Sequence, residues 1–262
     1  MTPFRLAVLV SLLGAAGARA LPMGGQVQPD RIAFGNVHTG ATVEASFMVL
    51  ERGDDKKIKF EVKAPRGVRV LGKSIDTQEY GPGNKFVRGS VEIAIDTAAA
   101  GEVTGDVAVT LGKQAVKVPV SATVKPRRAG LLRVLVVQTP FARFSTQDGR
   151  MFDAWTGLVK AAAWDVSYLL TRPGKAAFRD CDLASFDTIL LGQNGLFQLT
   201  PADVKRVRAF AEAGGRVVVA ANYFYRGTVP QANAVLAGYG IELRGYGVEN
   251  GPGQGQPGQG RP

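Results

Sequence analysis

The chain has 262 residues, with 32 Lys and Arg against 22 Asp and Glu and a formal net charge of +10. Its hydrophobic share of 45% is that of a globular protein able to bury a core. One Cys and one His exclude a disulfide scaffold and all but exclude a zinc site of Cys and His ligands, so we expect no metal site and no cofactor.

Residues 1–20 have the three parts of a secretory signal peptide. Arg5 supplies the positive start, residues 6–17 are apolar, and Ala18-Arg19-Ala20 is a small-x-small cleavage site. A membrane span needs about 20 apolar residues, so this stretch is too short for a stable anchor, and no later stretch qualifies. We therefore expect cleavage near Ala20 and a periplasmic or secreted protein; a buried N-terminal strand or helix is the alternative.

Residues 27–125 have the alternation of a β-sandwich. Short apolar runs are separated by Gly, Pro, Asp and Asn, and they predict strands at 31–34, 42–50, 57–63, 68–71, 86–95, 105–111 and 114–124. In the second run, Val43, Ala45, Phe47 and Val49 alternate with more polar residues, so one face is expected to enter a core. Seven strands of this length indicate an antiparallel Ig-like sandwich.

The first third of this region resembles a known family. Ile32-Ala33-Phe34-Gly35-Asn36-Val37-His38-Thr39-Gly40, followed by the apolar run 47–50, is similar to the opening of ASH/HYDIN-like immunoglobulin domains. The usual Asn-x-Gly after that run is replaced by Glu51-Arg52-Gly53. The resemblance implies an interaction or spacing module without a catalytic site.

His38 lies in the turn of this motif. We expect an exposed turn residue, because no other His or Cys is nearby in the sequence; a metal ligand or a base is the functional alternative.

The pattern changes after a Pro, Arg and Gly linker at 125–130. Apolar runs at 131–137, 164–170, 186–191 and 216–221 read as buried parallel strands. They alternate with helix patterns at 150–163, from Thr200 to Gly214, and from 232, and a short edge strand is expected at 240–243. These elements predict a three-layer α/β domain with a mainly parallel sheet over 131–248, and hence a multidomain α and β fold class.

This second region resembles the class I glutamine-amidotransferase-like superfamily, and within it the GIFT type. The residues that carry the resemblance are 186–192, 210–219, 232–236 and 239–241. Active members place a nucleophilic Cys on the turn after the strand at 216–221 and add a later His. This chain has Asn222-Tyr223 on that turn, Cys181 far upstream as a buried small hydrophobe or free thiol, and no His after residue 38. A glutaminase is therefore excluded, and an enzyme of any kind is disfavoured.

A retained ligand site is the alternative to an empty one. In an open α/β sheet, ligands bind at the carboxyl ends of the strands. The loops expected there carry amides, an aromatic ring and arginines suited to a sugar or peptide, although Asn, Gln and Gly are also common in turns for backbone reasons. The candidate ligand residues are Gln138, Arg143, Gln193, Asn194, Asn222, Tyr223 and Arg226.

Residues 249–262 are rich in Gly, Pro and Gln and are expected to be disordered. The scattered basic residues indicate a solvated basic surface, because export argues against nucleic acid as a partner. The sequence therefore predicts an exported, non-catalytic interaction or ligand-binding protein with an envelope protein or glycan as partner. The alternative is a hydrolase or sugar-processing enzyme similar to trehalose-utilisation proteins.

Overall fold

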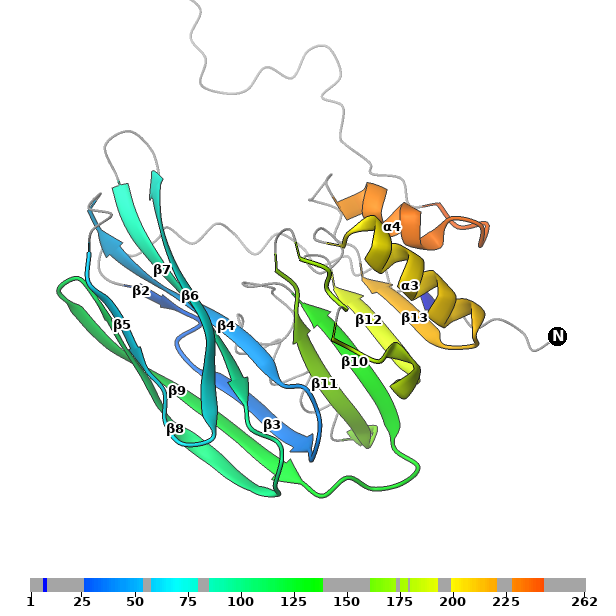
Figure 1. Ribbon diagram of the computed structural model, residues 1–262, viewed down its shortest axis with the longest axis horizontal. Coiled ribbons are helices and arrows are strands. Elements are labelled where there is room, and N and C mark those ends of the chain that lie inside the picture. Colours follow the sequence, from blue (N-terminus) through cyan, green and yellow to red (C-terminus); the bar gives the residue numbers. More distant parts are fainter. Residues whose placement is uncertain are drawn as a thin grey trace, which may run out of the picture.

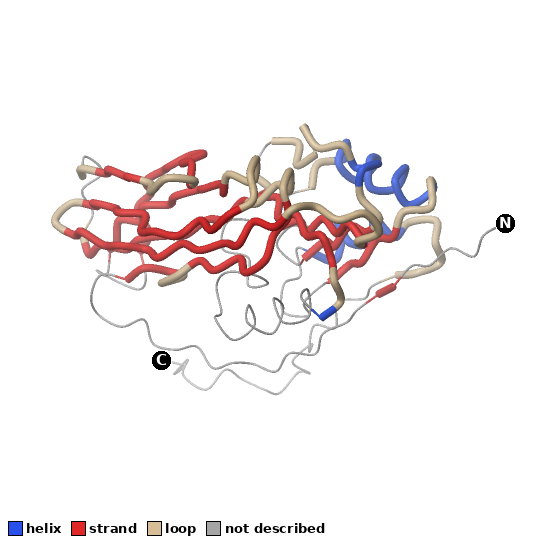
Figure 2. Tube along the Cα trace, turned by 90° about the horizontal axis from the view of Figure 1, so that it is seen from below, coloured by secondary structure: helices blue, strands red, loops and turns tan. Residues whose placement is uncertain are grey.

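The protein consists of a β-sandwich, a parallel sheet and a helical layer, in that spatial order (Figures 1 and 2). The computed structural model describes residues 7–8, 26–53, 58–79, 85–138, 161–172, 175–178, 180–192, 199–220 and 228–242. None of the helices formed by these residues is long and apolar enough to cross a membrane.

Two four-stranded sheets form the sandwich, and the strands lie close to the predicted positions. One sheet is ordered β2 (Gln26–Gln28), β4 (Glu44–Arg52), β7 (Lys85–Ile95), β6 (Val68–Glu79). The other is ordered β3 (Ile32–His38), β9 (Gln114–Lys125), β8 (Gly101–Leu111), β5 (Phe60–Lys63). All neighbours are antiparallel except β3 and β9.

The sandwich core follows from the alternation in each strand. Ala45, Phe47 and Val49 of β4 are completely buried, which confirms the inward face expected from the sequence. They share one core with Val107 and Val118 of the opposite sheet. The β8–β9 hairpin turns at Gly112, whose φ of +59° favours glycine and whose place leaves no room for a Cβ beside Glu51 and Ile58.

The third sheet is parallel throughout. Its order is β1 (Ala7–Val8), β13 (Arg216–Ala220), β12 (Thr188–Gly192), β10 (Leu132–Gln138), β11 (Trp164–Leu170). One face packs against α3 (Pro201–Glu212), α4 (Thr228–Leu236) and the short η1 (Leu183–Ser185). The predicted start of α3 is confirmed: Thr200 is its N-cap, and Asp203 completes a capping box.

The predicted three-layer α/β domain, and with it the α and β fold class, is wrong. The described part of the chain is mainly β and has two α-helices, both against the same face of the parallel sheet. In β10, Leu135 and Val137 face those helices, whereas Val134 and Val136 join the core of the sandwich. The sandwich therefore takes the place that the expected second helical layer would occupy at β10 and β11.

One further predicted strand is absent, and several predicted features lie outside the described residues. Residues 240–242 form no strand, although an edge strand was expected there. The helix expected at 150–163, the cleavage site at Ala20 and the tail from 249 fall wholly or largely outside the described residues. Ala7 and Val8, inside the expected signal peptide, pair with β13.

Candidate functional site at the carboxyl edge of the parallel sheet

Four strands of the parallel sheet end at one edge. Strands β11, β10, β12 and β13 are adjacent and run in the same direction, so Leu170, Gln138, Gly192 and Ala220 lie in a row. The segments that begin after β10, β12 and β13 carry the ligand residues expected from the sequence. The topology thus brings the starting points of those three segments to the edge where open parallel sheets bind ligands.

Only one of the predicted ligand residues is part of the described structure. Gln138 is the last residue of β10 and lies opposite Leu170 of β11. The other six lie outside the described residues: Arg143, Gln193, Asn194, Asn222, Tyr223 and Arg226. Their placement at this edge stays a prediction.

Two carboxylates of the sandwich reach the same edge. The backbone N–H of Leu170 donates to Oε2 of Glu44 over 2.9 Å. Two residues further on, Nε of Arg172 lies 2.6 Å from Oε2 of Glu92, with 30% and 21% of the two side chains exposed. In each contact the two residues are more than 75 positions apart in the chain. The two contacts together attach the end of β11 to the outer face of β4 and β7.

Burial raises the pKa of the Glu44 carboxyl above its usual value of 4.5. The Leu170 N–H and the Arg172 guanidinium partly oppose this by stabilising the charged form, whereas Glu92 adds to it by charge repulsion. A half-buried carboxyl with a raised pKa beside a second carboxylate is a common feature of functional sites. Sequence reasoning missed this pair. Strand alternation puts both residues on outward faces, but only the antiparallel register of β4 with β7 brings them together.

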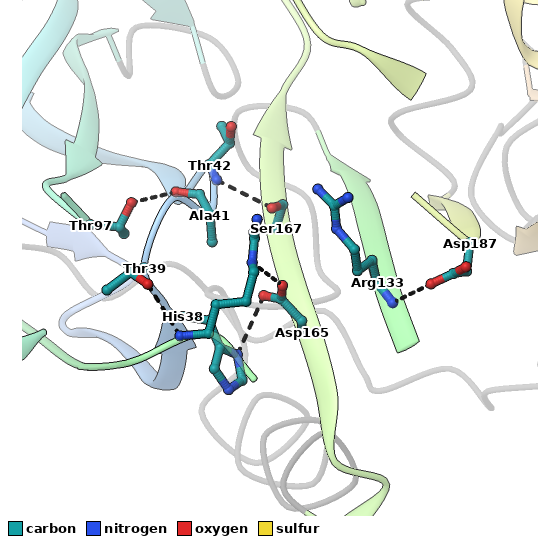
Figure 3. Close-up of polar contacts among 10 residues, drawn as sticks. His38, Thr39, Ala41, Thr42, Thr97, Arg133, Asp165, Ser167 and Asp187 are labelled. Carbon is teal, nitrogen blue, oxygen red and sulfur yellow. Dashed lines mark hydrogen bonds and ion pairs between the residues drawn. The ribbon is translucent and has the colours of Figure 1, made fainter. Parts of the chain in front are cut away.

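The opposite end of β11 holds a buried ionic contact (Figure 3). Asp165 is 2% exposed, and its Oδ2 lies 2.8 Å from Nε of Arg127 in the linker after β9. Its Oδ1 lies 3.3 Å from Nδ1 of His38 at the end of β3. His38 is only 12% exposed, so the expectation of an exposed turn residue is wrong: the parallel sheet covers it. The described residues contain no group of three or more His, Cys, Asp or Glu placed to hold a metal.

Between these two ends, the sandwich caps the backbone of β11. The Tyr168 N–H donates to the Thr42 carbonyl over 2.7 Å, and the Thr42 N–H donates to Oγ of Ser167 over 3.2 Å. Val43 forms a parallel bridge with Tyr168, whose ring lies 5.5 Å from that of Phe34. Ion pairs, backbone hydrogen bonds and a shared apolar core therefore join the sandwich and the parallel sheet along the whole length of β11.

Cys181 lies on the helix-covered side of the parallel sheet. Its side chain is half-buried against that core, and the guanidinium of Arg206 donates to its carbonyl over 2.7 Å. Burial raises the pKa of the thiol; Arg206 lowers it, and the negative charges of Asp182 and Glu44 raise it further. His38 contacts Asp165 on the sandwich side of the parallel sheet, whereas Cys181 lies on the helix-covered side, so these two residues do not form a nucleophile and base pair.

No family model matches the chain, and no curated protein sequence is recognisably similar to it. Among solved structures it is weakly similar to the ASH/PapD-like domain 7 of human CEP192, at 12% identity and a TM-score of 0.24, covering 44% of this chain and 99% of that one. Vibrio cholerae VesB protease matches at 12% identity and the same TM-score over 38% of this chain and 31% of the protease. Corynebacterium glutamicum amylomaltase matches at 10% identity and a TM-score of 0.24, over 70% of this chain and 26% of the enzyme.

Proposed function

We propose that this is an exported, non-catalytic interaction protein that binds an envelope protein or a glycan at the carboxyl edge of its parallel sheet. The observation that carries the proposal is the capping of β11 by the sandwich, from the Asp165–Arg127 contact at one end to the Arg172–Glu92 contact at the other. This capping gives the ligand edge a fixed orientation relative to the sandwich. Pre-organisation of this kind favours binding, because less conformational freedom is lost when the ligand arrives.

Chemistry at the two unique residues supports a non-catalytic role. A thiol needs a lowered pKa or an adjacent base to act as a nucleophile at neutral pH. Burial shifts the pKa of Cys181 in the opposite direction, and His38 lies on the other side of the parallel sheet, so it is not adjacent to the thiol. The resemblance of residues 186–192 and 210–219 to GIFT-type domains is part of this proposal. It would make the parallel sheet a relative of the amidotransferase-like sheets that lacks their Cys–His pair.

Export is the second part of the proposal and rests on residues 1–20. The test is intact mass and N-terminal sequencing of the protein recovered from the periplasm or medium of a bacterial host. Cleavage after Ala20 is expected. A cytoplasmic protein that keeps Met1 would overturn this part.

Binding at the carboxyl edge is tested with a glycan array, with purified cell-wall fragments, and with affinity capture from an envelope extract. The variants are Asn222→Ala and Tyr223→Ala, and the matched control is Ser121→Ala in β9, which belongs to a different sheet from the carboxyl edge. We expect the affinity for a bound glycan or a captured partner to fall about tenfold in the first two variants. The control should bind with unchanged affinity. Equal binding by all three variants would overturn the proposed site.

The alternative function, a sugar-processing hydrolase, is favoured by one observation, the Glu44 and Glu92 pair. Burial raises the pKa of the Glu44 carboxyl, and a carboxyl with a raised pKa near a second carboxylate is what glycosidases use for acid and base steps. Incubation with a panel of glycans and esters separates the two functions. Turnover that is abolished by Glu44→Gln would establish the alternative, whereas binding without turnover supports the interaction protein.

A further inference from the structure

The sheet edges of this protein are not equally protected. Natural sheets guard their edges with bulges, charges or covering segments, because an unpaired strand is a template for pairing with another chain. In β6, the register shifts between Val70 and Gly72. Lys73 of the same strand lies opposite Val91 in the register, so its side chain leaves the strand on the core side, but the residue is exposed and its Nζ donates to the Phe60 carbonyl of the opposite sheet over 2.9 Å. A bulge and a charged side chain therefore protect this edge.

Other edges are guarded as well. The β5 edge is only four residues long and carries charged side chains at Glu61 and Lys63. The register of β3 is broken between Ala33 and Asn36. The β11 edge is capped by the sandwich through Thr42 and Val43.

The outer edge of β13 shares only its shortness with these edges: it is five residues long, against four for β5. Its sequence is Arg-Val-Val-Val-Ala, and it pairs with β12 in unbroken register from Thr188 opposite Arg216 to Gly192 opposite Ala220. It has no bulge, no Pro and no charge after Arg216. Within the described part of the chain, this edge is covered by two residues alone, Ala7 and Val8, opposite Val218 and Val219.

Those two residues belong to the segment that the proposed export would remove. Among the described residues, the buried members of both apolar cores all come from Ile32 onward, and cleavage after Ala20 would take away the covering strand. We propose that the outer edge of β13 is a strand-acceptor site, covered by the N-terminal segment in the precursor and open in the mature protein to an apolar, extended segment of a partner protein. The availability of this site rests on the proposed export.

The chemistry of the occupant follows from the site. The added strand would run parallel to β13, as Ala7–Val8 does. Val217 and Val219 face the helix-covered core, and Val218 faces the opposite side and is half-buried. A strand that continues this sheet needs apolar residues on both faces, as strands within parallel sheets have. The segment around the present occupant, Leu6-Ala7-Val8-Leu9-Val10, has that character.

The experiment uses the mature protein, residues 21–262, and a fluorescent peptide with the sequence of residues 4–12. The control peptide carries Pro in place of Ala7 and Val8, which removes the donors that a parallel ladder needs. Fluorescence anisotropy measures affinity, and hydrogen exchange with mass spectrometry locates the bound peptide. The precursor, with residues 1–20 retained by a blocked cleavage site, is the protein control.

We expect the mature protein to bind the peptide at least about tenfold more tightly than it binds the Pro control. The precursor should bind the peptide about tenfold more weakly than the mature protein does. Exchange at 216–220 should slow on binding. Equal affinity for both peptides, or slowed exchange at another strand, would overturn the proposal. If the native N-terminus is uncleaved, export fails, whereas binding by the 21–262 chain still establishes the acceptor edge itself.

Discussion

Oδ2 of Asp165 lies 2.8 Å from Nε of Arg127, and this contact joins a strand of the parallel sheet to the linker that leaves the sandwich. Asp165 is 2% exposed, whereas Arg127 is 36% exposed. The contact therefore places a buried carboxylate against a cation that still reaches solvent. Removing one partner of a buried pair costs more than the pair itself contributes, because the remaining charge stays desolvated.

Asp165→Asn is expected to lower the free energy of unfolding by about 2 kcal/mol, less than for a fully buried pair because Arg127 can turn to water. Urea unfolding measures the change. The matched control is Asp106→Asn, an exposed residue of β8 that should change stability by less than about 0.5 kcal/mol. A double-mutant cycle with Arg127→Met should give a coupling energy of about 1 kcal/mol. An Asp165→Asn variant as stable as the control would contradict a structural role for this contact.

Glu44→Gln should change how stability depends on pH. Burial raises the pKa of Glu44 in the folded protein, so between the unfolded and the folded pKa the folded state binds more protons, and stability falls as pH rises through this window. The Gln variant has no such loss, and its amide oxygen can still accept from Leu170. Urea unfolding from about pH 4 to about pH 8 should therefore show the variant gaining stability relative to the wild type. A difference that stays constant over this range would argue against the raised pKa.

Cys181 should react slowly with thiol reagents in the folded protein. Burial raises the pKa of its thiol and so reduces the thiolate fraction, which is the reactive form. With DTNB at mildly alkaline pH, we expect labelling several times slower in native buffer than in urea. Cys181→Ser gives the blank, and it should leave ligand binding unchanged. Fast labelling in native buffer would indicate an activated thiol and would reopen a catalytic role.

Lys73→Val should promote self-association, because it removes the charged side chain that protects the β6 edge. Sedimentation velocity at increasing protein concentration measures this. The control is Lys125→Val, which makes the same change at an exposed position of β9 that lies opposite His38 of β3. Dimers or larger species are expected with the first variant alone. If the control associates to the same extent, added hydrophobicity rather than the open edge is the cause.

The strands of the sandwich and the helix start at Thr200 could be predicted from the sequence, because they depend on local signals. Alternation within residues 42–50 fixed which face of β4 enters a core, and Thr200, Pro201 and Asp203 form a local cap. The environment of His38 could not be predicted in this way. Its burial depends on Asp165, which is 127 residues away in the chain and belongs to another sheet.

Sequence alone was enough for the periodicity of each segment, the count of one Cys and one His, and the apolar N-terminal segment. The tertiary structure decided what covers each face and edge. The run 131–137 predicts a strand buried on both sides, but it cannot tell whether helices or another sheet supply the second layer. Val134 and Val136 face the sandwich core, and β13 is covered by Ala7–Val8. The physical reason is that the hydrophobic effect is non-directional. An apolar run indicates that a surface is buried, but which element buries it depends on contacts between segments far apart in the chain.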